Sequence, residues 1–259
     1  MDPCGIDERS ETRALSAPPA PPIGAVPPPL SAFTARERRL VRLLRTPLQV
    51  QRFLNALPYN TEPPPKGATQ RTFRGVINHH CAHCLEAALT AAVILEQHGW
   101  PPLVMSFESI DELDHVIFVY RRNGRWGSIG RSRDPGLHGR KPVFATPRAL
   151  ALSYVDAYVD FSGRITAYGI ADLRDVGNYD WRLSSGNVWK VERMLLELPH
   201  RRLHTSDARI DRLRKRYREY RARYGRKPVY YKRMERWTEL PLEFTEATKA
   251  TEITTKKRS

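Results

Sequence analysis

Residues 84–120 of the chain read CLEAALTAAVILEQHGWPPLVMSFESIDELDHVIFVY. The stretch begins with a cysteine and continues with small and aliphatic residues at helical spacing. Residues 103–107 and 115–120 are rich in β-branched and aromatic residues, which is typical of strands. We therefore expect a helix that begins at Cys84 and packs on two strands, the second of which begins at His115.

The segments on either side predict more helix and more sheet. Helix-start signals occur at Thr34, Thr46 and Thr146, where a threonine precedes a good first-turn residue or a proline. Residues 125–129 follow an Asn-Gly hairpin turn and predict a third strand, and residues 164–170 predict a further one. The expected fold class is α+β, with the cysteine-bearing helix on an antiparallel sheet and further helices toward the C-terminus.

Composition divides the chain of 259 residues into four parts. Residues 1–32 contain PAPPIGAVPPPL without apolar periodicity, which predicts an extended, solvated, disordered tail outside the fold. Residues 33–200 are long enough to bury one sizeable core, which carries the cysteine helix. Residues 201–244 predict a basic helical extension, and residues 245–259 predict a polar tail.

Cysteine usage and hydropathy limit the class of protein. Three cysteines, two of them three positions apart, do not form the disulfide framework of a small secreted domain. The longest apolar run, residues 87–95, is too short to cross a bilayer. We expect a soluble, cytoplasmic protein without a membrane partner, and the sequence indicates no oligomeric state.

A cysteine at the start of a helix favours thiol chemistry. The first turn of a helix carries unpaired N–H groups and partial positive charge, which stabilise a thiolate. Imidazole has the proton affinity needed to accept the thiol proton, and His115 opens a neighbouring strand. A structural cysteine beside an unrelated histidine gives the same pattern, so the residues alone leave both interpretations open.

Several ordered blocks resemble the bacterial transglutaminase-like cysteine proteinases. They are LRTPLQVQRFLNALPYNTE, HCLEAAL, DHVIFVYRRNGRWGSIGRS, KPVF and LALSYVDAY, within about residues 42–170. The resemblance implies a papain-like arrangement and acyl transfer or amide hydrolysis on a peptide or protein substrate. It also implies that Cys84 is the nucleophile and that His115 is the general base.

The third member of the expected catalytic triad departs from the family pattern. Transglutaminase-like cores typically have an acidic residue about four positions after the tryptophan of the third strand, but here Trp126 leads to Gly130. The next carboxylate is Asp134, which we predict as the third member, with Ser132 as a neutral alternative. Because Asp-Pro pairs start turns readily, a turn-forming role for Asp134 is the competing interpretation.

Stabilisation of an oxyanion requires preorganised donors close to the nucleophile. The backbone N–H of Cys84 is one candidate, and the side-chain amide of Asn78, six residues upstream, is another. A local hydrogen bond within a loop is the competing role for Asn78.

The same stretch contains five potential metal ligands, which are His79, His80, Cys81, His83 and Cys84. Zinc accepts such ligands, but a closed structural site normally needs a second ligand pair at a distance, and the chain has no second Cys-x-x-Cys. A redox pair of Cys81 with Cys84 lacks the surrounding βαβ pattern. We expect no metal and no cofactor, and a structural role for Cys81.

Two charged segments leave alternatives open. The net charge of the chain is +15, and residues 190–259 hold 21 Lys and Arg against 10 Asp and Glu. A helix from Ser206 with tyrosines at three- and four-residue steps either packs on the core, which the aromatic spacing favours, or binds nucleic acid in a catalytically inactive protein. The acidic loop over residues 108–114 either borders the site and selects basic substrates or is a solvated turn.

Overall fold

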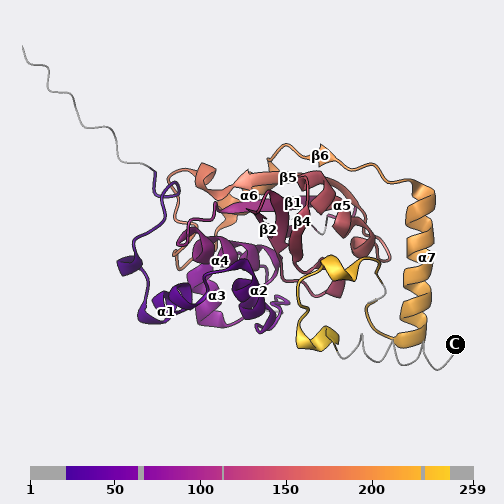
Figure 1. Cartoon of the computed structure of the whole chain (residues 1–259), viewed down its shortest axis with the longest axis horizontal. Coiled ribbons are helices and arrows are strands. Elements are labelled where there is room, and N and C mark those ends of the chain that lie inside the picture. Colours follow the sequence, from indigo (N-terminus) through magenta and orange to yellow (C-terminus); the bar gives the residue numbers. More distant parts are fainter. Residues whose placement is uncertain (1–21, 64–66, 113, 229–230, 246–259) are drawn as a thin grey trace, which may run out of the picture.

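The computed structural model describes residues 22–63, 67–112, 114–228 and 231–245. Its centre is a six-stranded sheet with the order β4-β3-β2-β1-β5-β6, in which every neighbouring pair is antiparallel (Figure 1). The strands are β1 Leu103–Ser109, β2 His115–Arg122, β3 Arg125–Ile129, β4 Arg140–Phe144, β5 Ile165–Asp172 and β6 Arg201–Arg202. The expected combination of helices with an antiparallel sheet is confirmed, and a papain-like arrangement stays a prediction.

Helices lie on both faces of this sheet. They are α1 Ala35–Leu43, α2 Pro47–Asn55, α3 Phe73–His79, α4 Cys84–Glu96, α5 Pro147–Tyr158, α6 Trp189–Leu196 and α7 Asp207–Tyr224. Helices α1 to α4 gather at one side of the molecule, and α7 stands at the opposite edge (Figure 1). Within the described ranges, each helix is too short or too polar to traverse a bilayer.

Side chains of β2 alternate between two separate hydrophobic cores. Val116, Phe118 and Tyr120 belong to the core beneath α1 to α4, whereas Ile117 and Val119 belong to the core beneath α5. This period of two is expected for a central strand that is covered on both faces. The two layers of helices therefore fix the direction of each β2 side chain, including that of the histidine at its start.

Helix α4 is the buried axis of the larger core. Every residue from Leu85 to Glu96 is buried, so the helix is covered all round by α2, α3 and the sheet. Its many alanines allow these neighbours to approach closely. Cys84, the first residue, is partly buried, which places the thiol at the one end of the helix that remains accessible.

Hydrogen bonds hold the start of the described chain against the fold. Gly24 donates its backbone N–H to the carbonyl of Gly177 at 2.9 Å, and Arg182 donates to the carbonyl of Gly24 at 3.0 Å. A Cβ at Gly24 would collide with the Gly177 carbonyl, so a glycine is required at this close approach. Hydrogen bonds to the carbonyls of Gly24, Pro28 and Ala32 thus fasten residues 22–32 to the core, although most of these residues are exposed. Residues 1–21 and 246–259 of the two predicted tails lie outside the described residues.

The basic helix α7 packs through its tyrosines, as the spacing predicted. Tyr217 and Tyr220 are buried, and the ring of Tyr217 meets Phe161 edge-on at 5.0 Å. Arg209 binds Asp156 at 2.5 Å, which ties the same helix to α5. Nucleic-acid binding by the outer face of α7 stays an alternative from the sequence.

We predict that Arg182→Met destabilises the fold. Arg182 holds the buried Glu96 carboxylate with two hydrogen bonds of 2.6 and 2.8 Å, and burial raises the pKa of Glu96 even though Arg182 acts against that rise. Removing the cation should cost about 3–5 kcal/mol of unfolding free energy at pH 8, measured by urea denaturation. The loss should be smaller at pH 5, where the carboxyl group takes up a proton. Arg182→Met with Glu96→Gln should recover part of the loss, and a single variant as stable as the parent at pH 8 would contradict this role.

Candidate active site

A cavity of about 530 Å³ lies where α4 and β2 both begin. Its lining includes Cys84 and His115. Tyr59, from the loop between α2 and α3, and Tyr158, from the end of α5, also line it. The two residues predicted as nucleophile and base therefore share one cavity, although they are 31 positions apart in the sequence.

His115 is held rigidly at the start of β2. Its ring stacks on Phe107 of β1 at 6.1 Å between centroids with an interplanar angle of 9°, and it contacts Tyr154 of α5 at 6.2 Å. Its Nε2–H donates to the backbone carbonyl of Leu137 at 3.0 Å. Because Nε2 is occupied, Nδ1 is the ring nitrogen that is left to interact with Cys84. The tautomer with a free Nδ1 can accept the thiol proton.

A second imidazole, which the sequence analysis considered only as a metal ligand, also contacts the thiol. His83 precedes the first turn of α4, lies next to Cys84 in the cavity lining, and approaches the Thr69 carbonyl through Nε2 at 2.7 Å. Burial acts to lower the pKa of His83, but the interactions with Cys84, Glu86 and Thr69 together raise it to about 9. His83 is therefore protonated at neutral pH.

The environment of Cys84 favours its thiolate. Burial acts to raise the pKa of Cys84, but the hydrogen bonds and charges of His115 and His83 outweigh it and hold the pKa well below its usual range. The helix N-terminus acts in the same direction. The site thus places a thiol with a lowered pKa on the wall of a cavity.

A buried carboxylate, Glu86, organises the entrance to α4. It accepts hydrogen bonds from the Thr69 hydroxyl at 2.8 Å and from three nitrogens at 3.1 Å, namely Asn60 Nδ2 and the backbone N–H groups of Arg71 and His83. The sequence analysis did not assign Glu86 a role. A glutamate three positions after the helix cap is the signal that would have indicated this bond to the His83 backbone.

Asp134 is not the partner of His115 in the structure. Its carboxylate binds Lys227 Nζ at 2.6 Å, while the His115 ring donates to the Leu137 carbonyl. Asp134 precedes a short 3-10 turn, Pro135–Leu137, whose backbone bends back toward the histidine. The turn-forming interpretation therefore fits Asp134, and Ser132, the neutral alternative, caps this turn by accepting from the Asp134 backbone at 3.1 Å.

Asn78 lies away from the cavity. Its competing role was that of a loop residue, but it belongs to α3, where its side chain is exposed, and it is not among the residues that line the cavity. Helix α3 was missed because it is short and contains Gly75. The backbone N–H groups of Cys84 and Leu85, at the first positions of α4, have no acceptor within the helix and remain the candidate oxyanion donors.

The five potential metal ligands do not converge. His79 and His80 are exposed at the end of α3, and the Cys81 sulfur accepts a hydrogen bond from Arg71 at 3.2 Å. No group of three or more His, Cys, Asp and Glu side chains suited to a metal ion occurs in the part of the chain that the structure describes. The zinc alternative therefore has no supporting geometry there.

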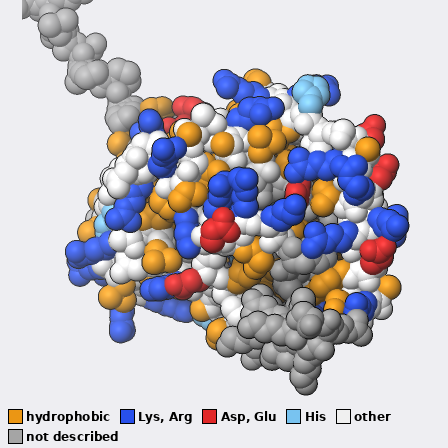
Figure 2. Space-filling model, turned by 45° about the vertical axis from the view of Figure 1, so that its right-hand side comes forward, with side chains coloured by type: hydrophobic (Ala, Val, Ile, Leu, Met, Phe, Trp, Pro, Cys, Tyr) orange, Lys and Arg blue, Asp and Glu red, His pale blue; other side chains and the backbone are white. Residues whose placement is uncertain are grey.

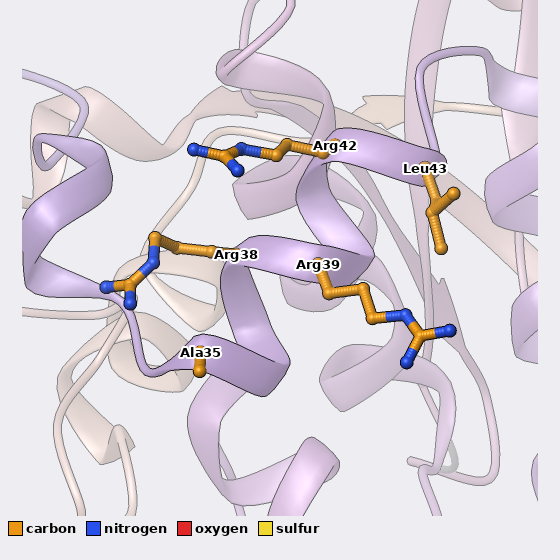
Figure 3. Close-up of a pocket in the computed structure, with 5 residues that line it drawn as sticks. All are labelled: Ala35, Arg38, Arg39, Arg42 and Leu43. Carbon is orange, nitrogen blue, oxygen red and sulfur yellow. The ribbon is translucent and has the colours of Figure 1, made fainter.

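A second hollow, of about 450 Å³, lies against α1 and has different chemistry. Figure 3 shows the side chains that line it, which are Ala35, Arg38, Arg39, Arg42 and Leu43. Arg38 and Arg42 extend in one direction and Arg39 in another, and Arg38 donates to the carbonyl of Phe33. These five residues supply neither a nucleophile nor a base, so the cavity at Cys84 is the candidate active site.

Comparisons with known proteins give only weak similarity. No protein-family model matches the chain, and no curated protein matches it. Solved structures of LapG from Legionella pneumophila align with it. The EGTA-treated form has 14% identity, 62% coverage of this chain, 96% coverage of LapG and a TM-score of 0.33. The calcium-bound form has 14% identity, 64% and 94% coverage and a TM-score of 0.32. At scores this low, fold and function must be argued from the chain itself.

The lowered pKa of Cys84 predicts an unusual pH profile for alkylation. An ordinary thiol, with a pKa of about 8.5, loses about tenfold in rate for each pH unit below that value. Cys84 should keep its rate well below pH 8 when iodoacetamide labelling is followed by peptide mass spectrometry. His115→Gln and His83→Gln should each move the profile toward higher pH. His98→Gln, a change at the far end of α4, should leave it in place.

The position of Asp134 predicts that its charge is dispensable for the thiolate. Asp134→Asn should leave the alkylation profile of Cys84 within about 0.3 pH units of the parent, because the nearest cation of Asp134 is Lys227 rather than His115. The measurement is the same labelling series. A shift as large as that of His115→Gln would restore Asp134 as the third member.

Proposed function

We propose that the protein is a cysteine-dependent acyl-transfer enzyme, a transglutaminase-like cysteine peptidase or hydrolase, in which Cys84 is the nucleophile and His115 the general base. The observation that carries this proposal is that Cys84 and His115 line one cavity, where Cys84 begins a buried helix and His115 acts to lower the pKa of its thiol. The resemblance of the sequence blocks to bacterial transglutaminase-like cysteine proteinases supports the same chemistry.

Acylation begins with attack of the Cys84 sulfur on the carbonyl carbon of an amide. The proton that the thiol has given up resides on Nδ1 of His115. Electrons from the C=O bond move to oxygen in the tetrahedral intermediate, and they return as the C–N bond breaks. His115 gives its proton to the leaving nitrogen, which departs as an amine, and a thioester remains on Cys84.

Deacylation uses the same groups in the reverse order. His115 takes a proton from water, the resulting oxygen nucleophile attacks the thioester carbon, and the C–S bond breaks to release a carboxylic acid. An amine in place of water gives a new amide by the same steps. In both cases the sulfur leaves as the stabilised thiolate, and the net reaction balances as hydrolysis or transamidation.

The hydrogen-bond and charge partners of His115 and His83 give the two imidazoles different roles. The Leu137 carbonyl accepts from Nε2–H of His115, which orients the ring and stabilises it when it becomes protonated. Burial acts to lower the pKa of His83, but its interactions with the Cys84 thiolate, Glu86 and the Thr69 carbonyl raise it to about 9, so His83 carries a positive charge beside the sulfur while the sulfur is a thiolate. His115 is therefore assigned the proton transfers, and His83 the electrostatic stabilisation of the thiolate.

The developing oxyanion meets donors at the start of α4. The backbone N–H groups of Cys84 and Leu85 are free of intrahelical bonds, and the partial positive charge of the helix adds to them. A cavity of about 530 Å³ has room for a short peptide segment, which fits a peptide or protein substrate.

The proposal predicts a thioester that can be trapped with p-nitrophenyl acetate. The parent should release a burst of about one nitrophenolate per chain and carry an acetyl group on Cys84 in peptide mass spectrometry. Cys84→Ala should abolish the burst, and His115→Gln should slow acylation by about 10²–10⁴-fold. His98→Gln is the matched control and should acylate at the parental rate.

Two outcomes would decide against the enzyme. A burst that persists in Cys84→Ala would place the chemistry elsewhere, and failure of the parent to acylate Cys84 would favour an inactive binding protein. For the nucleic-acid alternative, salt-sensitive retention on nucleic acid that survives Cys84→Ala is the positive result.

A further inference from the structure

Carboxylates outnumber Lys and Arg side chains in the lining of the cavity that contains Cys84. Besides Asp134, which Lys227 neutralises, its lining includes Glu62, Asp111, Glu112, Asp114, Asp160 and Glu192. Among the described residues of the lining, Arg133 is the single Lys or Arg side chain, and it lies 4.0 Å from Asp134. The loop over residues 108–114, which the sequence left open between two roles, thus borders the site.

Neutral groups organise these carboxylates without cancelling their charge. Asp160 accepts from the backbone N–H groups of Ser162 at 3.0 Å and Gly163 at 2.7 Å, and Asp111 accepts from the Ser109 and Ser162 hydroxyls. No described Lys or Arg forms a salt bridge with the six carboxylates. Within that group, Glu62 faces the imidazole of His83 at 3.8 Å, and His200 acts on Asp114.

Besides the carboxylates, the cavity lining contains a side-chain oxygen without a hydrogen-bond donor among the described residues. Gln70 lines the same cavity and is only 9% exposed. Its Nε2 donates to Glu192 at 2.7 Å, whereas its Oε1 has no hydrogen-bond partner among the described residues. A buried carbonyl oxygen without a donor is costly, so this group indicates a ligand that brings N–H to the cavity.

The charge of the cavity is opposite to that of the whole chain. The chain carries a net charge of +15, and Figure 2 shows Lys and Arg side chains spread across the face that contains α7. Beyond about 8 Å, salt screens such surface charges, while low-dielectric walls concentrate the field of groups that line a cavity. The local carboxylates therefore govern which ligands approach Cys84.

We infer that the acyl substrate presents a cationic N–H group, a lysine or arginine side chain, to the carboxylate-lined cavity beside Cys84. The inference rests on the proposed function for the identity of the ligand as a substrate. The carboxylates supply the charge complement, and the free Gln70 oxygen supplies an acceptor for one N–H.

Charge-matched thiol reagents test the cavity independently of catalysis. Trimethylammonioethyl and sulfonatoethyl methanethiosulfonate each form a mixed disulfide when the Cys84 thiolate attacks the sulfenyl sulfur and methanesulfinate leaves. Rates at Cys84 are read by peptide mass spectrometry in the full chain and divided by those of N-acetylcysteine. The normalised cation-to-anion ratio should be about ten at low salt and should fall toward one in 1 M salt. A normalised ratio at or below one at low salt would overturn the inference.

Substitutions of lining carboxylates test whether the preference for the cationic reagent arises in the cavity. Glu112→Gln combined with Glu192→Gln removes two of the lining charges and should lower the ratio at least threefold. Glu197→Gln removes an exposed carboxylate outside the lining and should leave the ratio unchanged. Circular dichroism verifies the fold of each variant. If the double variant does not fold, the salt dependence of the parent decides the question.

Acyl substrates separate this inference from the proposed function. The p-nitrophenyl esters of N-acetyl-lysine and N-acetyl-glutamine should acylate Cys84 with kcat/KM values that differ by about tenfold in favour of lysine. Equal values with a normalised reagent ratio of one would overturn the inference and leave the enzyme intact. Failure of both esters to acylate Cys84, with the cationic reagent still preferred, would overturn the enzyme and leave the charge selectivity of the cavity intact.

Discussion

The buried carboxylate of Glu86 is the constraint on which the site depends. It collects hydrogen bonds from both ends of the loop between α2 and α3 and from the residue that caps α4, so one side chain joins three parts of the chain at the point where Cys84 begins the helix. A carboxylate without solvent is tolerated only when its oxygens are satisfied in this way. Because His83 is bound through its backbone N–H to Glu86, the position of the second imidazole follows from the same contact.

The stability of the fold and the reactivity of the thiol come from opposite ends of one helix. The interior of α4 is covered on all sides, and at its far end Glu96 is paired with Arg182. Its first turn, in contrast, opens onto a cavity with unsatisfied backbone donors. A rigid helix with a single open end holds the sulfur still while the two imidazoles share its charge, which is the preorganisation that electrostatic stabilisation requires.

Much of this arrangement could be predicted from the sequence, because its signals are local. The helix starts at Thr34 and Thr46, the strand over residues 125–129 and the shared cavity of Cys84 and His115 agree with the structure. Helices α3 and α6 were missed because they are short and rely on tertiary packing. The partners of Asp134 and His115 were also beyond prediction. Lys227 is remote in sequence, and the acceptor at Leu137 is a main-chain carbonyl that every residue carries.

That main-chain acceptor has a consequence for how the site responds to genetic change. In a site where a side-chain carboxylate orients the histidine, a single amino-acid substitution can remove that carboxylate. Here the orienting oxygen belongs to the backbone of a short turn, which the buried Arg140 clamps through the carbonyls of Gly136 and His138. Most replacements at position 137 preserve the oxygen, whereas an inserted or deleted residue in the turn would displace it. Loop length, more than residue identity, is what selection must conserve at this position.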